Sequence, residues 1–468
     1  MKTLFLNPPS FSRFDSAGAR FAATRKTHSL WYPAWIGYAA AFVPKSKLID
    51  CPASEINLEK LLGIIRSYKL IVIYTSTPSF ANDVAVAQGI KNRYPETKVI
   101  FVGPHVSVLP EESLAASEGI DAVARGEFEE TILEISKGKS WAKIKGLSFR
   151  KNGKIIHSHK RPPLTNLDKL PFISPIYKRD LPILRYHLPF ALHPYIAIYA
   201  GRGCPNQCTF CLWPQTFTGR IYRKRSVENV VDEVIWIRKN MPEIKEIFFD
   251  DDTFTINKNW VNNLCRKIAP LKITWSANAR ADIPSQLLKK MKESGCRVLV
   301  VGYESGDNQI LKNVKKNINV SQMKRFTQDA KKAGLMIHGT FVLGLPGETK
   351  KTIEKTYRFA CDLDPDTIQV TIATPLPGTE FYEWCQKKDF LKEEVKVDRS
   401  GYQTPIVSYP GLSAKEVYQA VEKFHLKFYF RPHYILKTFG SALSSPAEAK
   451  RILISAWEYG KYLLTSSK

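Results

Sequence analysis

Short runs of β-branched and aliphatic residues alternate with helical patterns along most of this chain of 468 residues. In the first part the runs are TLFL, Leu70 to Tyr74, Lys98 to Val102 and Ala122 to Ala124. Six further runs, separated by helical stretches, follow from about Ile196. Alternation of this kind is typical of βαβ units, in which a parallel sheet is buried on both faces. The pattern predicts an α/β fold.

The two series of strands predict two α/β domains. Residues 1–140 hold four strand candidates, which fits a Rossmann-like domain. Residues 141–195 are rich in Lys, Arg and Pro, so we expect a small β-ribbon and an extended linker there. Residues 196–400 hold six strand–helix repeats, too few for a complete eight-fold barrel, and predict a partial (β/α)6 barrel of the TIM type. Residues 401–468 are predicted to form a basic helical region.

Charge and composition narrow the classes of partner and compartment. Lys and Arg number 69 against 44 Asp and Glu, and the net charge of +25 would attract phosphates, nucleic acid or an anionic membrane surface. Eight cysteines are too sparse for a disulfide scaffold, and three of them fall within eight positions, a pattern that favours a metal site in a reducing compartment. Neither the start, MKTLFLNPPSF, nor the apolar stretch from Trp31 to Val43 matches a signal peptide or a membrane span. We therefore expect a cytoplasmic protein.

Cys204, Cys208 and Cys211 form a C-x-x-x-C-x-x-C motif directly after the first strand of the second series. Three thiolates at this spacing can bind three irons of a [4Fe–4S] cluster and leave the fourth iron open to a small molecule. A structural zinc site would need a fourth protein ligand, and no Cys or His follows close behind. The surrounding Gly, Pro, Asn and Gln indicate a solvent-facing loop, which disfavours three core cysteines.

The motif and its place in the barrel resemble the cluster loop of the radical S-adenosylmethionine (SAM) enzymes. In that family the open iron binds the amino and carboxylate groups of SAM, and electron transfer then cleaves the sulfonium to a 5′-deoxyadenosyl radical. The resemblance implies that Cys204, Cys208 and Cys211 hold the cluster and that Phe210 lies against the adenine. It also implies an electron donor such as flavodoxin or ferredoxin.

Other strand ends of the barrel carry candidate SAM ligands. Many family members have Gly-Gly-Glu where this chain has three aspartates; a carboxylate suits the ammonium group of SAM, but which of the three binds it stays open. The remaining candidates match positions that contact the SAM carboxylate or ribose, or glycine-rich backbone that could approach the adenine. Taken singly, each also fits a turn or a solvated charge. The SAM candidates are Asp250, Asp251, Asp252, Asn278, Arg280, Glu304, Gly344, Pro346 and Gly347.

Three loops of the first domain resemble the ligand-binding loops of the cobalamin-binding domain found in one branch of the family. They follow three predicted parallel strands, whose carboxyl ends would bring them together, although tight strand exits would have the same composition. The D-x-H-x-x-G motif that supplies a histidine to cobalt in the mutases is absent, and a lone loop histidine is more often hydrogen-bonded than metal-bound. The cobalamin candidates are Ser76, Thr77, Ser79, Gly103, His105, Gly126 and Glu127.

Over almost its full length the chain resembles the hopanoid-associated proteins of this branch, on segments such as CTFCLWPQT, FFDDDTFT and FYFRP. The resemblance implies an amphiphilic substrate, a glucosamine-bearing hopanoid whose ring contracts to a cyclitol ether. The alternative is a cobalamin-dependent radical SAM methyltransferase that acts on an unactivated carbon. A tRNA-modifying enzyme is a third interpretation, but no β-rich module with stacking aromatics is apparent, so no nucleic-acid partner is expected.

The basic stretch from about Leu412 interleaves aromatic residues with cations, and two interpretations stay open. The rings could lie at a lipid boundary with the cations toward phosphate, which would place the protein peripherally at the inner face of a membrane. Alternatively, a capping helix packs the rings inward. The aromatic residues are Phe424, Phe428, Tyr429, Phe430 and Tyr434, and the cations are Lys423, Lys427 and Arg431.

Overall fold

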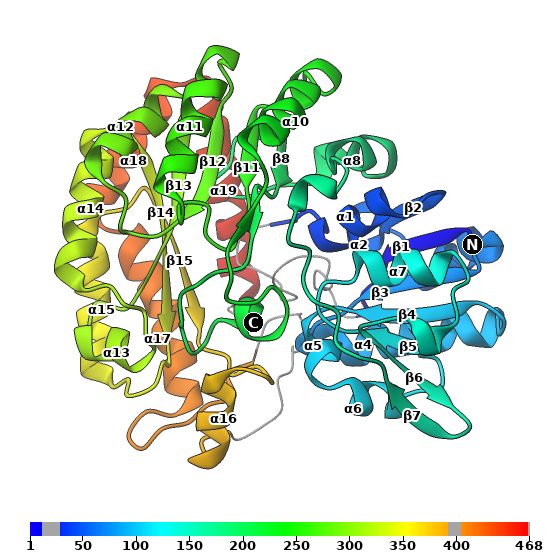
Figure 1. The fold of residues 1–468 in the computed structure, drawn as a ribbon. Coiled ribbons are helices and arrows are strands. Elements are labelled where there is room, and N and C mark those ends of the chain that lie inside the picture. The colour runs from blue at the N-terminus through cyan, green and yellow to red at the C-terminus, as the bar shows by residue number, and fades with distance from the viewer. Residues whose placement is uncertain (12–28, 392–403, 467–468) are drawn as a thin grey trace.

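A computed structural model describes residues 1–11, 29–391 and 404–466, which form two α/β domains and a helical C-terminal region (Figure 1). The first domain is built on a seven-stranded sheet of order β2-β1-β3-β4-β5-β6-β7, parallel up to β5 and antiparallel beyond it. Its strands are β1 (Thr3–Asn7), β2 (Ser46–Asp50), β3 (Leu70–Tyr74), β4 (Lys98–Val102), β5 (Ala122–Ala124), β6 (Leu147–Lys151) and β7 (Lys154–His157).

Helices cover both faces of this sheet, which explains why every residue of β1, β3 and β5 is buried. The ribbon expected after residue 140 is the hairpin β6–β7, and it extends the first sheet rather than standing apart from it. The helices are α1 (Ala34–Phe42), α2 (Cys51–Ser54), α3 (Leu58–Ile64), α4 (Phe80–Arg93), α5 (Pro104–Val108), α6 (Pro110–Ala115) and α7 (Glu129–Ser136), and α8 (Ser174–Asp180) belongs to the connection to the second domain.

The second domain is the predicted partial barrel. Its six strands are all parallel and lie in the order β8-β11-β12-β13-β14-β15, so that each strand is joined to its neighbour by a helical crossover (Figure 1). The expected fold class, a Rossmann-like domain followed by a curled half-barrel and helices, is confirmed. The strands are β8 (Tyr195–Ile198), β11 (Glu246–Phe249), β12 (Trp275–Ala279), β13 (Cys296–Glu304), β14 (Met336–Leu343) and β15 (Thr367–Ile372).

Most barrel helices begin at a side chain that accepts a hydrogen bond from the first turn, which fixes where each strand exit ends. The residues that cap these helices are Ser226, Asn257, Asn319 and Thr349. The helices are α10 (Val227–Asn240), α11 (Lys258–Ile268), α12 (Ser285–Glu293), α13 (Asn308–Asn313), α14 (Val320–Lys332) and α15 (Lys350–Leu363); α9 (Leu212–Thr216) and the short pair β9 (Gly201–Arg202) and β10 (Arg223–Lys224) lie between β8 and α10.

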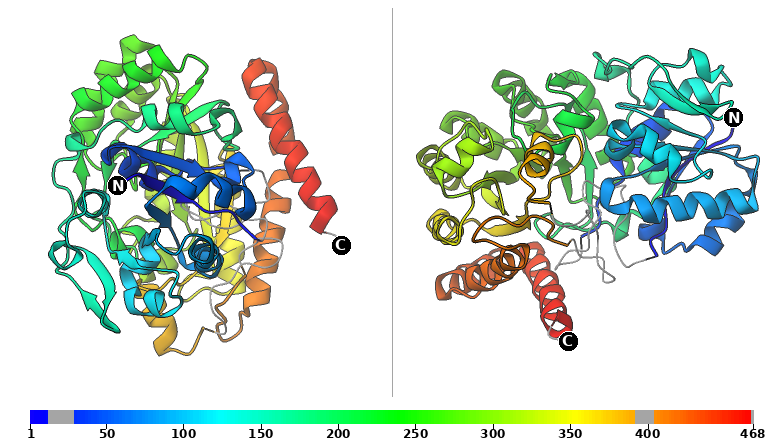
Figure 2. Two further views of the ribbon diagram at one scale, coloured as in Figure 1. Left: turned by 90° about the vertical axis from the view of Figure 1, so that its right-hand side faces the viewer. Right: turned by 90° about the horizontal axis from the view of Figure 1, so that it is seen from below.

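Three C-terminal helices lie on the flank of the barrel beside its last strand (Figure 2). They are α17 (Ala414–Tyr429), α18 (Pro432–Ser444) and α19 (Pro446–Ser466), whereas the shorter α16 (Glu380–Lys387) packs near the three cysteines, where the amide of Phe381 donates to the carbonyl of Thr209. The Tyr429 hydroxyl donates to the carbonyl and accepts from the amide of Ile368, each at 2.9 Å, and His425 accepts from the amide of Val370 at 3.3 Å. Side chains of α17 thus occupy the backbone groups of β15, an edge strand that would otherwise be open to pairing.

The aromatic residues of the basic stretch therefore have different environments. Phe424, Phe428 and Tyr434 are buried against the barrel, as the capping interpretation expects, while Phe430 is 60% exposed. No helix among the described residues is long and apolar enough to cross a membrane.

Buried charges join the two domains. Arg223 of β10 donates to both carboxylate oxygens of Glu127, at 2.6 and 2.9 Å, and Arg202 of β9 lies 2.7 Å from a carboxylate oxygen of Glu129. All four side chains are less than one tenth exposed. Trp35 of α1 packs between the domains, with the Arg202 guanidinium 4.6 Å from its ring centre. The loop after β5 is therefore fixed to the start of the cysteine loop.

We predict that Arg223→Met lowers the free energy of unfolding by about 3–5 kcal/mol, because it leaves the Glu127 carboxylate buried without its partner. Lys267→Met is the matched control, since Lys267 pairs with Glu228 at 2.6 Å on the surface and such pairs contribute about 0–1 kcal/mol. Urea unfolding followed by tryptophan fluorescence measures both. Equal effects of the two substitutions would contradict this role of the buried pair.

Candidate active site

The loop that carries Cys204, Cys208 and Cys211, called the cysteine loop below, is held by hydrogen bonds to its backbone. The side-chain amide of Gln215, in α9, donates to the carbonyls of Cys208, Thr209 and Cys211 at 3.4, 3.0 and 2.7 Å. The Gln215 amide oxygen in turn accepts from the amide of Glu380 at 3.0 Å. The side chain of Gln215 therefore fixes the path of the loop through its backbone carbonyls and not through the thiols.

The thiols lie at a partly covered surface. Cys204 and Cys208 are buried and Cys211 is half-buried. Asn206 donates to the Cys204 sulfur at 3.2 Å. Across the described ranges, no three His, Cys, Asp or Glu side chains are grouped to hold one metal ion. In a [4Fe–4S] cluster each thiolate binds a different iron, so three thiols in one covered loop fit the cluster without converging on one point.

The three aspartates after β11 have separate partners. Asp251 accepts from the amide of Ala200 at 2.7 Å, and Asp252 accepts from the amide of Gly203 and the hydroxyl of Thr218, both at 3.0 Å. These two carboxylates fix the backbone that leads into Cys204. Asp250 instead accepts from the side-chain amide of Asn278 at 3.0 Å, which brings SAM candidates from neighbouring strands together.

A buried ion pair lies beside the second cysteine. Glu304 and Lys316 are 2.6 Å apart, and the backbone carbonyl of Lys316 accepts from Arg280 at 3.2 Å. Burial raises the pKa of the Cys208 thiol, while Lys316 acts to lower it. Burial acts to lower the pKa of Lys316, but Glu304 and Cys208 raise it above its ordinary value. Two SAM candidates thus meet a lysine that the sequence analysis did not single out.

The glycine-rich turn after β14 is stabilised by its own backbone conformation and by hydrogen bonds within the turn. Gly344 and Gly347 have φ angles of 89° and 88°, which favour glycine. The carboxylate of Glu348 accepts from the amide of Gly344 at 2.7 Å, and burial raises the pKa of Glu348 to about 7. A Cβ on Gly344 would meet Val417 and one on Gly347 would meet the side-chain amide of Asn313, both of which are side-chain atoms, so it is the positive φ that favours glycine at these two positions.

This turn lies next to the cysteine loop. A cavity of about 440 Å³ is lined by Thr209 of the cysteine loop together with Pro346 and Gly347. Phe210 packs against the cluster of apolar residues that contains Leu345. The structure therefore places Phe210 and the glycine-rich turn on one side of the cysteine loop, and the pair Glu304–Lys316 beside Cys208.

The three candidate cobalamin loops are linked to one another. The Thr77 hydroxyl and His105 Nδ1 are 3.0 Å apart, which joins the loops after β3 and β4. The Ser107 hydroxyl donates to the Gly103 carbonyl at 2.7 Å and accepts from the Gly126 amide at 2.9 Å, which joins the loops after β4 and β5. The loops therefore meet at the carboxyl edge of the sheet, where parallel sheets bind ligands.

The individual candidates in these loops differ in environment. Burial lowers the pKa of His105 to about 4, and its ring lies 4.3 Å from that of Phe80, so the ring is neutral and packed. Ser79 donates to the buried carboxylate of Asp83 at 2.7 Å, and its hydroxyl lies 3.2 Å from that of Ser76. Glu127 is held by Arg223, as described above, so its carboxylate joins the domains.

Two glycines of these loops serve different purposes. A Cβ on Gly103 would overlap the carbonyl oxygen of Thr75, so close backbone approach requires glycine there. Gly126, with φ of 69°, has no atom within 4 Å of where its Cβ would be. Small side chains and open space at the sheet edge fit a large planar ligand such as a corrin ring.

The two sets of loops face each other. Helix α5, in the loop after β4, packs against α9 of the cysteine loop. A Cβ on Gly378 would be 2.6 Å from Val108 and 2.8 Å from Thr216, so three segments meet closely at this point. Both sheets thus direct the carboxyl ends of their strands into the space between the domains.

Comparison with known families identifies both domains. The family described as the radical SAM superfamily matches residues 198–360, and the B12 binding domain matches residues 22–136. The first match contains all three cysteines and the second contains the three linked loops.

Individual relatives cover nearly the whole chain. An uncharacterised methyltransferase of Pyrococcus horikoshii is 33% identical over 93% of this chain and 94% of its own. An anaerobic magnesium-protoporphyrin IX monomethyl ester cyclase of Cereibacter sphaeroides is 27% identical over 92% of this chain and 71% of its own.

A solved structure shares the fold over the whole length. The radical SAM methyltransferase TsrM from Kitasatospora setae, solved with cobalamin and a [4Fe–4S] cluster, superposes with a TM-score of 0.70 and 14% identity over 100% of this chain and 99% of that one. The chain belongs to the radical SAM superfamily, in the branch with a B12-binding domain, and is an enzyme that uses a [4Fe–4S] cluster, SAM and cobalamin.

Proposed function

We propose that this enzyme transfers a methyl group from SAM to an unactivated carbon of its substrate. The observation that carries the proposal is the full-length similarity to a relative named a methyltransferase. When bound, the cluster supplies the electron that cleaves SAM to a 5′-deoxyadenosyl radical, and the cobalamin supplies the methyl group. The facing loops of the two domains suit a reaction in which one carbon of the substrate is presented to both cofactors in turn.

The residues of the chain divide this work between the two sides of the interface. Cys204, Cys208 and Cys211 are proposed to bind the cluster. Asp250 is proposed to bind the ammonium group of SAM, because Asp251 and Asp252 bind the backbone amides of Ala200 and Gly203, whereas Asp250 accepts from the side chain of another SAM candidate, Asn278. The other proposed SAM contacts are Phe210, Asn278, Arg280, Glu304, Gly344, Pro346 and Gly347.

The cobalamin loops are proposed to hold the corrin ring by backbone and hydroxyl groups. Ser76, Thr77, Gly103 and Gly126 lie at the sheet edge, while Ser79 is buried beneath them and His105 is engaged with Thr77. The position of His105 supports a role in fixing this loop rather than in binding cobalt. Glu127 is proposed to position the loop after β5 through its pair with Arg223, and not to contact the cobalamin.

Contraction of a hopanoid head group is the second candidate function. It rests on the resemblance to the hopanoid-associated proteins, and a relative named a cyclase supports only the more general point that relatives of this chain catalyse reactions other than methyl transfer. Both candidates need an electron donor of the flavodoxin or ferredoxin kind, and the hopanoid candidate in addition needs an amphiphilic substrate. A nucleic-acid substrate has no supporting observation besides the net charge of +25.

The two candidates predict different products from SAM. After anaerobic reconstitution, methyl transfer is expected to give S-adenosylhomocysteine and 5′-deoxyadenosine in equal amounts, with a substrate heavier by one CH₂. Ring contraction gives 5′-deoxyadenosine with no S-adenosylhomocysteine beyond the level without substrate. Liquid chromatography with mass spectrometry of the SAM products distinguishes them, using SAM with a deuterated methyl group.

We predict that Cys208→Ala abolishes both the brown chromophore and the formation of 5′-deoxyadenosine, because loss of one thiolate removes a cluster ligand. Cys265→Ala is the control, since Cys265 is buried in α11 away from the loop. Iron and sulfide analysis after reconstitution measures the cluster. Four irons per chain in the Cys208→Ala protein would overturn the assignment.

We also predict that Gly126→Phe lowers cobalamin content at least tenfold, because the ring enters the open space at the sheet edge. Gly138→Phe is a matched control: it too has a positive φ and no atom within 4 Å of its Cβ, but it follows α7 at the opposite edge. The visible spectrum of the reconstituted proteins gives the cobalamin content. Equal loss in both variants would indicate backbone strain and count against these loops.

A further inference from the structure

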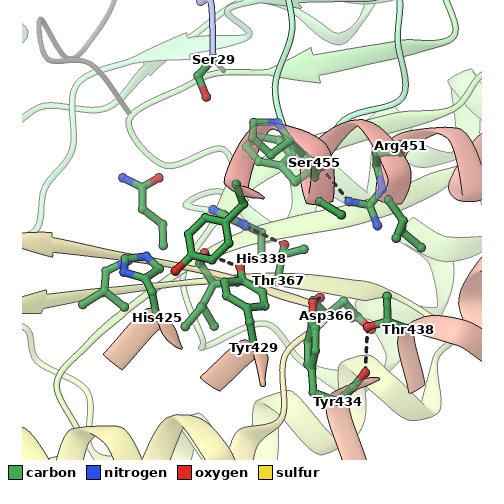
Figure 3. Close-up of a pocket in the computed structure, with 18 of the residues that line it drawn as sticks. Ser29, His338, Asp366, Thr367, His425, Tyr429, Tyr434, Thr438, Arg451 and Ser455 are labelled. Atoms are coloured by element: carbon green, nitrogen blue, oxygen red, sulfur yellow. Dashed lines mark hydrogen bonds between the residues drawn. The ribbon is translucent and has the colours of Figure 1, made fainter. Parts of the chain in front are cut away.

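A cavity of about 510 Å³ lies between the last two barrel strands and the helices α17 to α19 (Figure 3). Its walls include the side chains of Phe190, Tyr429, Phe430, Ile435 and Ile452. Small-molecule sites have volumes of about 300–1,000 Å³ and are lined mainly by apolar and aromatic groups, so this cavity is large enough for a ligand of that class.

The charged side chain of Arg451 and several polar side chains of the cavity are engaged with the protein. Arg451 donates to the carbonyl of Pro189 and the carboxylate of Glu448, both at 2.7 Å. His338 lies 2.7 Å from the Thr367 hydroxyl, and Tyr434 donates to the carbonyl of Asp366 at 2.8 Å (Figure 3). With these charges satisfied internally, the walls favour an apolar occupant over an anion.

The inner end of the cavity leads toward the candidate active site. Gln369 of β15, which lines the cavity, is paired with Thr340 of β14, and Thr340 is paired with Gly302 of β13. A Cβ on Gly302 would overlap the carboxylate of Glu304, the partner of Lys316. Adjacent strands are about 4.8 Å apart, so Gln369 lies roughly 10 Å across the sheet from that ion pair.

The outer end opens beside exposed apolar side chains of α18 and α19. Phe430, which follows α17, and Ile435 of α18 line the cavity and are also 60% and 42% exposed. On α18 and α19, Leu436, Phe439, Leu453 and Trp457 are each about 70% exposed. Apolar side chains grouped on a surface in this way are typical of contact with a lipid surface or an apolar molecule.

We propose that this cavity binds the apolar body of a lipid-like substrate, which enters from the side of α18 and α19 and extends along β15 toward the Glu304–Lys316 pair. The proposal rests on the proposed function for the reaction at the inner end, but the binding step itself needs neither SAM nor turnover. It assigns the C-terminal helices to substrate recognition, in addition to their role in covering the sheet edge.

The test is equilibrium binding of cis-parinaric acid, a fluorescent fatty acid, to the reconstituted full chain without SAM. Ser455 lines the cavity, and its hydroxyl is buried with no hydrogen-bond partner among the described residues, so Ser455→Trp blocks the cavity without removing a bond. We expect one probe per chain and at least tenfold weaker binding by Ser455→Trp. Lys450→Trp is the matched control: Lys450 is exposed on the same helix, lies outside the cavity lining and is not one of the exposed apolar side chains, so this variant is expected to bind as the unchanged protein does.

A second variant keeps the test informative if the Ser455→Trp protein does not fold. Thr438→Phe fills the cavity from α18 and is expected to weaken binding of the probe by a similar factor. Unchanged binding by both folded cavity variants, or equal weakening by Lys450→Trp, would overturn the proposal. Probe binding without methyl transfer would overturn only the proposed reaction, while methyl transfer without probe binding would overturn only this assignment of the cavity.

Delivery of the probe separates two sources of the ligand. If the probe reaches the cavity from phosphatidylcholine vesicles as readily as from buffer, and Leu436→Ser slows only the vesicle route, the exposed side chains collect the ligand from a bilayer. If Leu436→Ser slows neither route, entry at this side of the helices is overturned.

Discussion

The buried pairs Arg223–Glu127 and Arg202–Glu129 determine how the two domains meet. Glu127 lies in the loop after β5 and Glu129 is the first residue of α7, while each guanidinium lies in the short ribbon on either side of the cysteine loop. Two charged pairs that are taken out of water require partners at close range, which leaves little freedom in the relative orientation of the domains. Because of them, the linked loops of the first sheet face the cysteine loop of the second.

The half-barrel is open along β15, and the C-terminal helices compensate for that opening. An edge strand exposes a row of backbone donors and acceptors, and here Tyr429 and His425 occupy them through side-chain bonds. This arrangement leaves space between α17 to α19 and the strand, in contrast to a seventh paired strand, which would fill it. The cavity beside β15 is therefore a result of how the edge is covered.

Much of the fold could be predicted from sequence, because strand and helix periodicities are local. The six barrel strands and the C-x-x-x-C-x-x-C loop were predicted from patterns within a few residues. Strand β2 (Ser46–Asp50) was not predicted, since SKLID has no clear apolar run. The partners of Asp251 and Asp252 could not be predicted either, because adjacent aspartates look alike until the backbone amides that they bind are known. Lys316 escaped notice for the same reason: it is one of a run of basic residues, and only its contact with Glu304 distinguishes it.

The amide of Gln215 has a consequence for how the metal centre forms. Many small metal sites exist only after the ion has ordered the chain, so that metal affinity includes the cost of folding. Here three carbonyls of the cysteine loop are already bound by one neutral side chain, which is itself tied to α16. These hydrogen bonds order the loop independently of any metal ligand, so less of the free energy of cluster binding needs to be spent on shaping the loop.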